Sequence, residues 1–92
     1  MNKEELKTGR VLVDFYATWC GPCKMLMKQV DVYESEVDDV KVVKVNVEDE
    51  PEMSQAFGVR ALPTLVYMED GEVIKKVTGM QKVEDIKKLT NS

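Results

Sequence analysis

The sequence contains no histidine and only two cysteines, and these two scarcities remove several classes of chemistry. Without histidine, the chain has no Ser-His or Cys-His pair to activate a nucleophile, and it lacks the commonest metal ligand. Two cysteines do not by themselves supply the four ligands of a structural zinc site, so a metal would need carboxylates or a second chain. We therefore expect no metal centre. The two cysteines are instead expected to take part in thiol-disulfide redox chemistry.

Long apolar runs are also missing. No stretch approaches the roughly 20 apolar residues that a transmembrane helix needs, so we expect no contact with the membrane interior. The first ten residues, MNKEELKTGR, lack the apolar centre of a signal peptide, which favours a cytoplasmic location. The net charge is −4, with both signs interspersed, which argues against binding to the phosphates of nucleic acids.

The apolar pattern predicts alternating strands and helices in one domain, residues 1–92. Continuous valine-rich runs are typical of strands that are buried on both faces, and apolar positions three and four residues apart indicate helices. After a polar lead-in over residues 3–8, the expected elements are strand 11–17, helix 22–36, strand 40–47, a short helix from Pro51 to Gly58 with Met53, Ala56 and Phe57 inward, strands 64–68 and 73–77, and a closing helix with Val83, Ile86 and Leu89 inward.

This order, β-α-β-α-β-β-α, limits the possible topologies. A parallel βαβ unit is followed by two strands joined at Asp70-Gly71, a pair that signals a two-residue hairpin turn. Right-handed crossovers then place the helices on both faces of the sheet. We expect an α/β fold in three layers, α/β/α, around a mixed sheet of four strands.

The two cysteines stand where the first predicted strand meets the first long helix, in the segment VLVDFYATWCGPCK. A helix N-terminus lowers the pKa of a cysteine because it stabilises negative charge. Cys20 lies just ahead of the helix and Cys23 one turn inside it, so Cys20 should attack a substrate disulfide and Cys23 should resolve the mixed disulfide. The alternative is a structural disulfide, although such a short loop removes little entropy from the unfolded chain.

An acid, Asp14, lies in the middle of the first predicted strand. If the following helix covers the face of the strand that carries Asp14, the carboxylate is buried beneath the cysteine pair. Burial raises the pKa of a carboxyl group, and a group that titrates near neutrality could accept the proton of Cys23. The alternative is an acid at a solvated strand edge.

Four segments together resemble the thioredoxin family: VDFYATWCGPCKM, KVNVE, VRALPTLVYMEDGEV and the later Gly79. The resemblance runs from about Val11 to the C-terminus. It implies the thioredoxin-like fold and a thiol-disulfide oxidoreductase that reduces protein disulfides through a Cys-Gly-Pro-Cys cycle. It also implies disulfide-containing target proteins, a thioredoxin reductase that returns the electrons, and no bound cofactor.

The resemblance also assigns roles to single residues. It makes Asp14 the proton acceptor and brings Lys44 close to it, whereas a lysine that faces solvent from an edge strand is the alternative. It implies a cis peptide bond between Leu62 and Pro63, a form that only about 5–6% of such bonds adopt in folded proteins. Pro63 would pack against the cysteines, and the backbone of Leu62 would pair with substrate.

A shallow apolar docking surface for substrates would surround the cysteines. The resemblance places Trp19, Pro63, Gly79 and Met80 on it, and the substrate-binding set further includes Gly21 and Pro22 between the thiols. For Trp19, packing in the core is the alternative.

The chain departs from the family ahead of its first strand. Only ten residues precede Val11, where thioredoxins usually carry another strand and helix. Strand 40–47 should then form a sheet edge, guarded by Lys41, Lys44 and the polar segment 2–8, and we expect a monomer. Two other functions fit the same residues: an electron donor dedicated to one enzyme or peroxidase, and a binding subunit whose thiols are idle.

Overall fold

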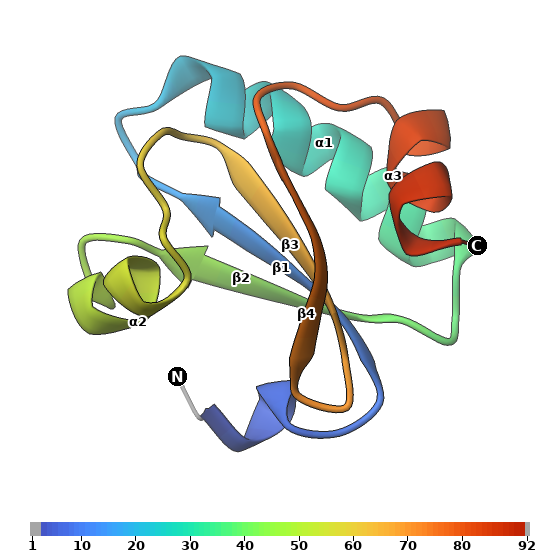
Figure 1. Ribbon diagram of the computed structural model, residues 1–92. Coiled ribbons are helices and arrows are strands. Elements are labelled where there is room, and N and C mark those ends of the chain that lie inside the picture. Colours follow the sequence, from blue (N-terminus) through green and yellow to red (C-terminus); the bar gives the residue numbers. More distant parts are fainter. Residues whose placement is uncertain (1–2, 92) are drawn as a thin grey trace.

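The computed structural model describes residues 3–91 and has the predicted order of elements (Figure 1). The elements are η1 (Lys3–Leu6, a 3-10 helix), β1 (Arg10–Tyr16), α1 (Gly21–Glu36), β2 (Lys41–Asn46), α2 (Pro51–Ala56), β3 (Thr64–Glu69), β4 (Glu72–Thr78) and α3 (Val83–Thr90). The predicted boundaries differ from these by one or two residues. The β-α-β-α-β-β-α order is confirmed.

The four strands form one mixed sheet in the order β2-β1-β3-β4. β1 pairs in parallel with β2 and antiparallel with β3, and β3 pairs antiparallel with β4. Asp70 and Gly71 both have positive φ, 49° and 85°, as a two-residue hairpin turn of this kind requires. β1 is therefore central, whereas β2 and β4 are the edges of the described sheet.

Alternation along β1 divides the interior into two apolar cores. Leu12 packs with apolar side chains of α1 and α3, including Leu26 and Ile86. Val13, on the opposite face, packs with Met53 of α2 and Leu6 of η1. Figure 1 accordingly shows α1 and α3 on one side of the sheet and α2 and η1 on the other. Since side chains two residues apart share a face, Asp14 lies on the α1 face with Leu12.

One prediction about the short helix α2 was wrong. Ala56 is exposed, and Ser54 is buried in its place, next to the predicted Met53. The Ser54 hydroxyl donates a hydrogen bond of 2.8 Å to the carbonyl oxygen of Glu50. Because this bond satisfies the hydroxyl inside its own helix, Ser54 can be buried at little cost.

The polar segment before β1 is anchored mainly on the β3–β4 turn. The backbone N–H of Gly9 donates to Asp70 Oδ1 over 2.8 Å, and the N–H of Asp70 returns a bond of 2.9 Å to the Gly9 carbonyl. The segment also reaches the β2 edge, where Lys41 Nζ donates to the Glu5 carbonyl over 3.5 Å. This single bond links the segment to the β2 edge, so the predicted cover of that edge stays a prediction, and Asn2 lies outside the described residues.

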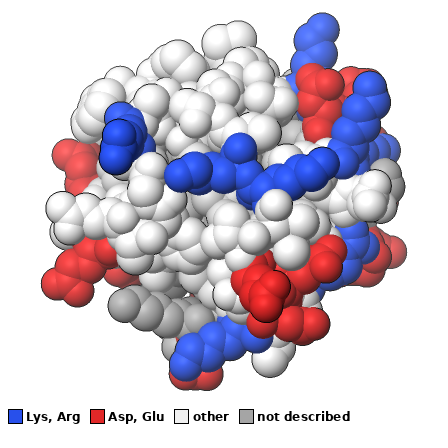
Figure 2. Space-filling view, viewed as in Figure 1, with Lys and Arg blue, Asp and Glu red and all other residues white. Residues whose placement is uncertain are grey.

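The surface carries charges of both signs. In Figure 2, a band of lysine and arginine side chains crosses the middle of the visible face, and acidic side chains gather below it and at the rim. Within residues 3–91, no helix has the length and apolar character needed to cross a membrane.

Candidate active site

The cysteine pair lies at the start of α1, as predicted. Cys20 is the N-cap residue, and Pro22 occupies the first turn, where a missing N–H costs nothing. Cys20 and Cys23 form a disulfide with their Cα atoms 5.3 Å apart, so this is the oxidised protein. The backbone N–H of Cys23 donates to Cys20 Sγ over 3.2 Å. After reduction, this N–H and the positive end of the helix would stabilise a thiolate on Cys20.

The two sulfur-bearing residues differ in depth. Cys20 exposes 5% of its surface and Cys23 only 1%. Both pack with Ala17 and with the half-buried side chain of Leu62. In the oxidised protein both cysteines are therefore buried, and Cys20 is the slightly more accessible of the two.

Asp14 is fully buried on the α1 face of β1. Neither oxygen of its carboxyl group has a hydrogen-bond partner among the described residues. Burial, the largest influence, raises the pKa of Asp14 from 3.8 to about 6, whereas the charge of Lys44 lowers the pKa and that of Asp31 raises it. The alternative of a solvated acid at a strand edge is wrong, and the group can exchange a proton near neutral pH.

Lys44 lies beside Asp14 in the sheet but is bonded elsewhere. The two residues are register partners on the parallel strands β1 and β2. Lys44 Nζ donates to Asp31 Oδ1 of α1 over 2.7 Å, and this bond is the main reason that the pKa of Lys44 is raised. Sequence reasoning missed Asp31, since an exposed acid on a helix means little until the helix is placed over the sheet.

Three loops meet at the end of the sheet that carries the cysteines (Figure 1). The Leu62-Pro63 peptide bond is cis, and Pro63 is buried. The N–H of Gly79 donates to the Pro63 carbonyl over 2.8 Å, which ties the β4–α3 loop to the proline loop. Gly79 has φ of 97°, a conformation that favours glycine. The structure thus brings together the cysteines, Leu62, Pro63 and Gly79.

The remaining predicted substrate-binding residues are exposed. Trp19 exposes 69% of its surface and Met80 43%, so the alternative that Trp19 packs in the core is wrong. Gly21 and Pro22 are exposed between the two cysteines. Exposed apolar side chains next to a shielded disulfide are suited to contact with a partner protein.

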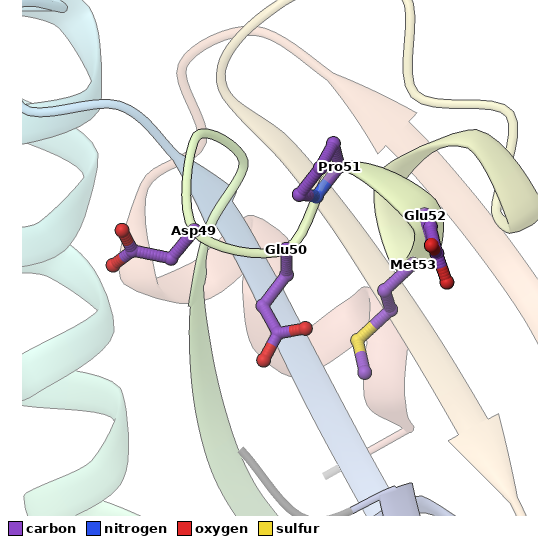
Figure 3. A pocket seen from close by; sticks show the side chains of 5 residues that line it. All are labelled: Asp49, Glu50, Pro51, Glu52 and Met53. Carbon is purple, nitrogen blue, oxygen red and sulfur yellow. The ribbon is translucent and has the colours of Figure 1, made fainter.

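A hollow of about 270 Å³ lies elsewhere, at the start of α2, and it has a different character (Figure 3). Its lining includes Asp49, Glu50 and Glu52, whose carboxylates point in different directions in Figure 3. It contains none of the cysteine-site residues, so we place the active site at the disulfide.

Comparison with known proteins supports this placement. The thioredoxin family profile matches residues 2–92. The chain is 41% identical over 86 residues to a thioredoxin of Chlamydia caviae, which covers 94% of this chain and 84% of that protein. It is 39% identical over 88 residues to the thioredoxin of Bacillus subtilis, with 95% and 85% covered.

Solved structures give the same result. Mitochondrial thioredoxin 3 of Saccharomyces cerevisiae superimposes with a TM-score of 0.89 at 33% identity, covering 97% of this chain and 84% of that one. A mutant thioredoxin from Halobacterium salinarum gives a TM-score of 0.87 at 39% identity, with 95% and 76% covered. With its cysteine pair at the helix start and these similarities over most of its length, the chain belongs to the thioredoxin family and is a thiol-disulfide oxidoreductase.

Proposed function

We propose that Cys20 is the attacking thiol and Cys23 the resolving thiol in the reduction of disulfides in target proteins. The observation that carries this proposal is the Cys23 N–H directed at Cys20 Sγ, 3.2 Å away, at the N-terminus of α1. That arrangement favours negative charge on Cys20, whereas Cys23 is more deeply buried.

The reaction transfers two electrons in two exchanges. The Cys20 thiolate attacks one sulfur of the target disulfide, forms a mixed disulfide and releases the other sulfur as a thiolate, which takes up a proton. Cys23 then loses its proton, and its thiolate attacks Cys20 Sγ. This step restores the Cys20–Cys23 disulfide, and the target leaves with both cysteines reduced.

Asp14 accepts the proton of Cys23 in the second exchange. Its burial on the α1 face, beneath the helix that begins at the cysteines, and its pKa of about 6 support this role. An acceptor that titrates near the working pH can both take up the proton and give it to the departing thiol. Lys44, whose charge acts on Asp14, modulates this carboxyl group.

Trapping of the mixed disulfide tests the assignment of the two thiols. The Cys23→Ser variant should accumulate a covalent complex with a disulfide-containing target such as insulin, because the second exchange is blocked. The Cys20→Ser variant should accumulate none. Mass spectrometry of the non-reduced mixture measures both, and a complex formed through Cys23 in the Cys20→Ser variant would reverse the roles.

The proposal extends to the electron donor of the protein and to its oligomeric state. We propose that a thioredoxin reductase returns the two electrons, in the cytoplasm, and that the chain acts as a monomer on the apolar surface around Trp19. Exposed Lys41 and Lys44 along the β2 edge support the monomer, since charged side chains discourage strand pairing between molecules. Light scattering at micromolar concentration tests it, and a dimer that crosslinks through residues 41–46 would contradict it.

A further inference from the structure

We infer that Asp31 is a positioning residue for this reaction: it holds the ammonium group of Lys44 at the surface and so leaves the Asp14 carboxyl group without a direct partner. This inference rests on the proposed role of Asp14 as the acceptor of the Cys23 proton. It gives a function to an exposed acid that lies eight residues beyond Cys23 on α1.

The ammonium group of Lys44 has two possible carboxylate partners, Asp14 and Asp31. Lys44 is the register partner of Asp14 on the neighbouring strand, and its side chain reaches Asp31 on α1. Its Nζ is 2.7 Å from Asp31 Oδ1, in a pair whose side chains are 34% and 59% exposed. Both Asp14 oxygens, by contrast, lack a hydrogen-bond partner among residues 3–91. Asp31 therefore holds the cation on the solvent side of the carboxyl group that it could neutralise.

The carboxylate that Lys44 binds determines which protonation state Asp14 favours. A charge-assisted bond from Lys44 would hold the pKa of Asp14 down and make the carboxylate a poor proton acceptor. Asp31 opposes this in two ways, because it binds the cation and because its own negative charge raises the pKa of Asp14. The two effects have the same sign.

Lys44 and Asp31 are the charged groups that act on the Asp14 carboxyl group among the described residues. On β3 its register partner is the apolar Leu65. On α1, Cys23 is held in the disulfide, and the charge of Glu34 acts on Lys44. The charges that bear on the pKa of Asp14 come from Lys44 on β2 and Asp31 on α1.

The test is a titration of Asp14 in the oxidised Asp31→Asn variant. The carboxyl carbon is followed by NMR, and its signal is assigned by its loss in Asp14→Asn. We expect the pKa of Asp14 to fall by roughly half a unit or more, because a like charge is removed and Lys44 is released. The acid limb of the pH profile of mixed-disulfide resolution should move to lower pH together with it. Asp31→Glu, which keeps the carboxylate, should restore most of the wild-type pKa.

Glu36→Gln is the matched control. Glu36 lies on the same helix and pairs with Lys87 over 2.7 Å, with side chains of comparable exposure. Its charge does not contribute to the pKa of Asp14. The loss of this pair should leave the Asp14 titration and the pH profile at their wild-type positions.

Two results would overturn the inference. One is an unchanged or raised Asp14 pKa in Asp31→Asn; the other is an equal fall in Glu36→Gln, which would mean that any acid on α1 has the same effect. Failure of the proposed function looks different: Asp14→Asn would then resolve mixed disulfides at the wild-type rate, whatever the titration in Asp31→Asn shows.

Discussion

Two polar side chains on the same face of β1, four residues apart, are accommodated in opposite ways. Arg10, at the start of the strand, is half-buried and fully engaged. Its Nε donates to the hydroxyl of Tyr67 over 2.7 Å, and its guanidinium also bonds to Asp39 and to the carbonyl oxygen of Thr90. Asp14, farther along, is completely buried and has no hydrogen-bond partner among the described residues.

Arg10 stabilises the fold through its hydrogen bonds, whereas the unpaired carboxyl group of Asp14 costs the fold stability. The bonds of Arg10 connect β1 to β3 and to the end of α3, and a satisfied network of this kind makes the local structure more rigid. An unsatisfied buried polar group costs at least about 1–3 kcal/mol, and more when it is charged. Such a group calls for an explanation, and for Asp14 the proposed transfer of a proton from Cys23 would be one.

The largest effect should come from Asp14→Asn, measured as stability against pH. The pKa of Asp14 is raised from 3.8 to about 6, so the fold favours the protonated form. The stability that this group contributes is complete below pH 3.8 and is lost as the pH rises through 6. At neutral pH the ionised carboxylate therefore costs about 3 kcal/mol, and the amide removes this pH dependence. Between pH 4 and 7, where most of this change falls, the oxidised variant should gain about 2 kcal/mol relative to wild type in urea unfolding.

The same variant should be slower in turnover. Without an acceptor, the Cys23 proton leaves less readily, so reduction of insulin should fall at neutral pH while the formation of the mixed disulfide changes less. Equal activity of variant and wild type from pH 6 to 9 would remove Asp14 from the mechanism. The comparison with Arg10 would then contrast two structural residues.

Much of the fold and part of this contrast could be predicted from the sequence. The valine-rich run around Asp14 and the helical stripe through Leu26 and Val30 have strong periodicity, so their elements were correct to within two residues. Alternation along β1 then predicts that Asp14 and Leu12 share a face. Burial of the acid follows, once a helix covers that face.

The rest depends on contacts that leave no local pattern. Asp31 and Lys44 are surface residues on different elements, and their pairing depends on how α1 crosses the sheet. The network of Arg10 joins residues up to 80 positions apart, which no short window of sequence can indicate. The cis bond before Pro63 followed from the family resemblance alone, since cis is the minority form of such bonds.

A smaller effect should come from Arg10→Met, which removes the charged end and keeps the aliphatic stem. The loss of bonds to Tyr67 and to the Thr90 carbonyl should cost about 2 kcal/mol in urea unfolding. Turnover and the titration of Asp14 should stay at wild-type values, because Arg10 lies four residues from Asp14, about 13 Å along the strand. Arg10→Lys should recover only part of the stability, since an ammonium group cannot reproduce the planar fork. Slower turnover in Arg10→Met would show that the two ends of β1 are coupled.

The smallest effect should come from Asp39→Asn. This variant removes the exposed ion pair of Arg10 and keeps its half-buried bonds to Tyr67 and Thr90. The Arg10–Asp39 pair joins side chains that are 28% and 68% exposed, so solvent screens much of the attraction. Its loss should cost at most about 0.5 kcal/mol. In 1 M salt, where the screening length is about 3 Å, even this difference should vanish, whereas the cost of Arg10→Met should persist. If Asp39→Asn instead destabilised the protein as much as Arg10→Met, the ion pair would be the main contribution of Arg10. The half-buried bonds to Tyr67 and Thr90 would then be secondary, and the start of β1 would no longer be a region stabilised by satisfied internal hydrogen bonds.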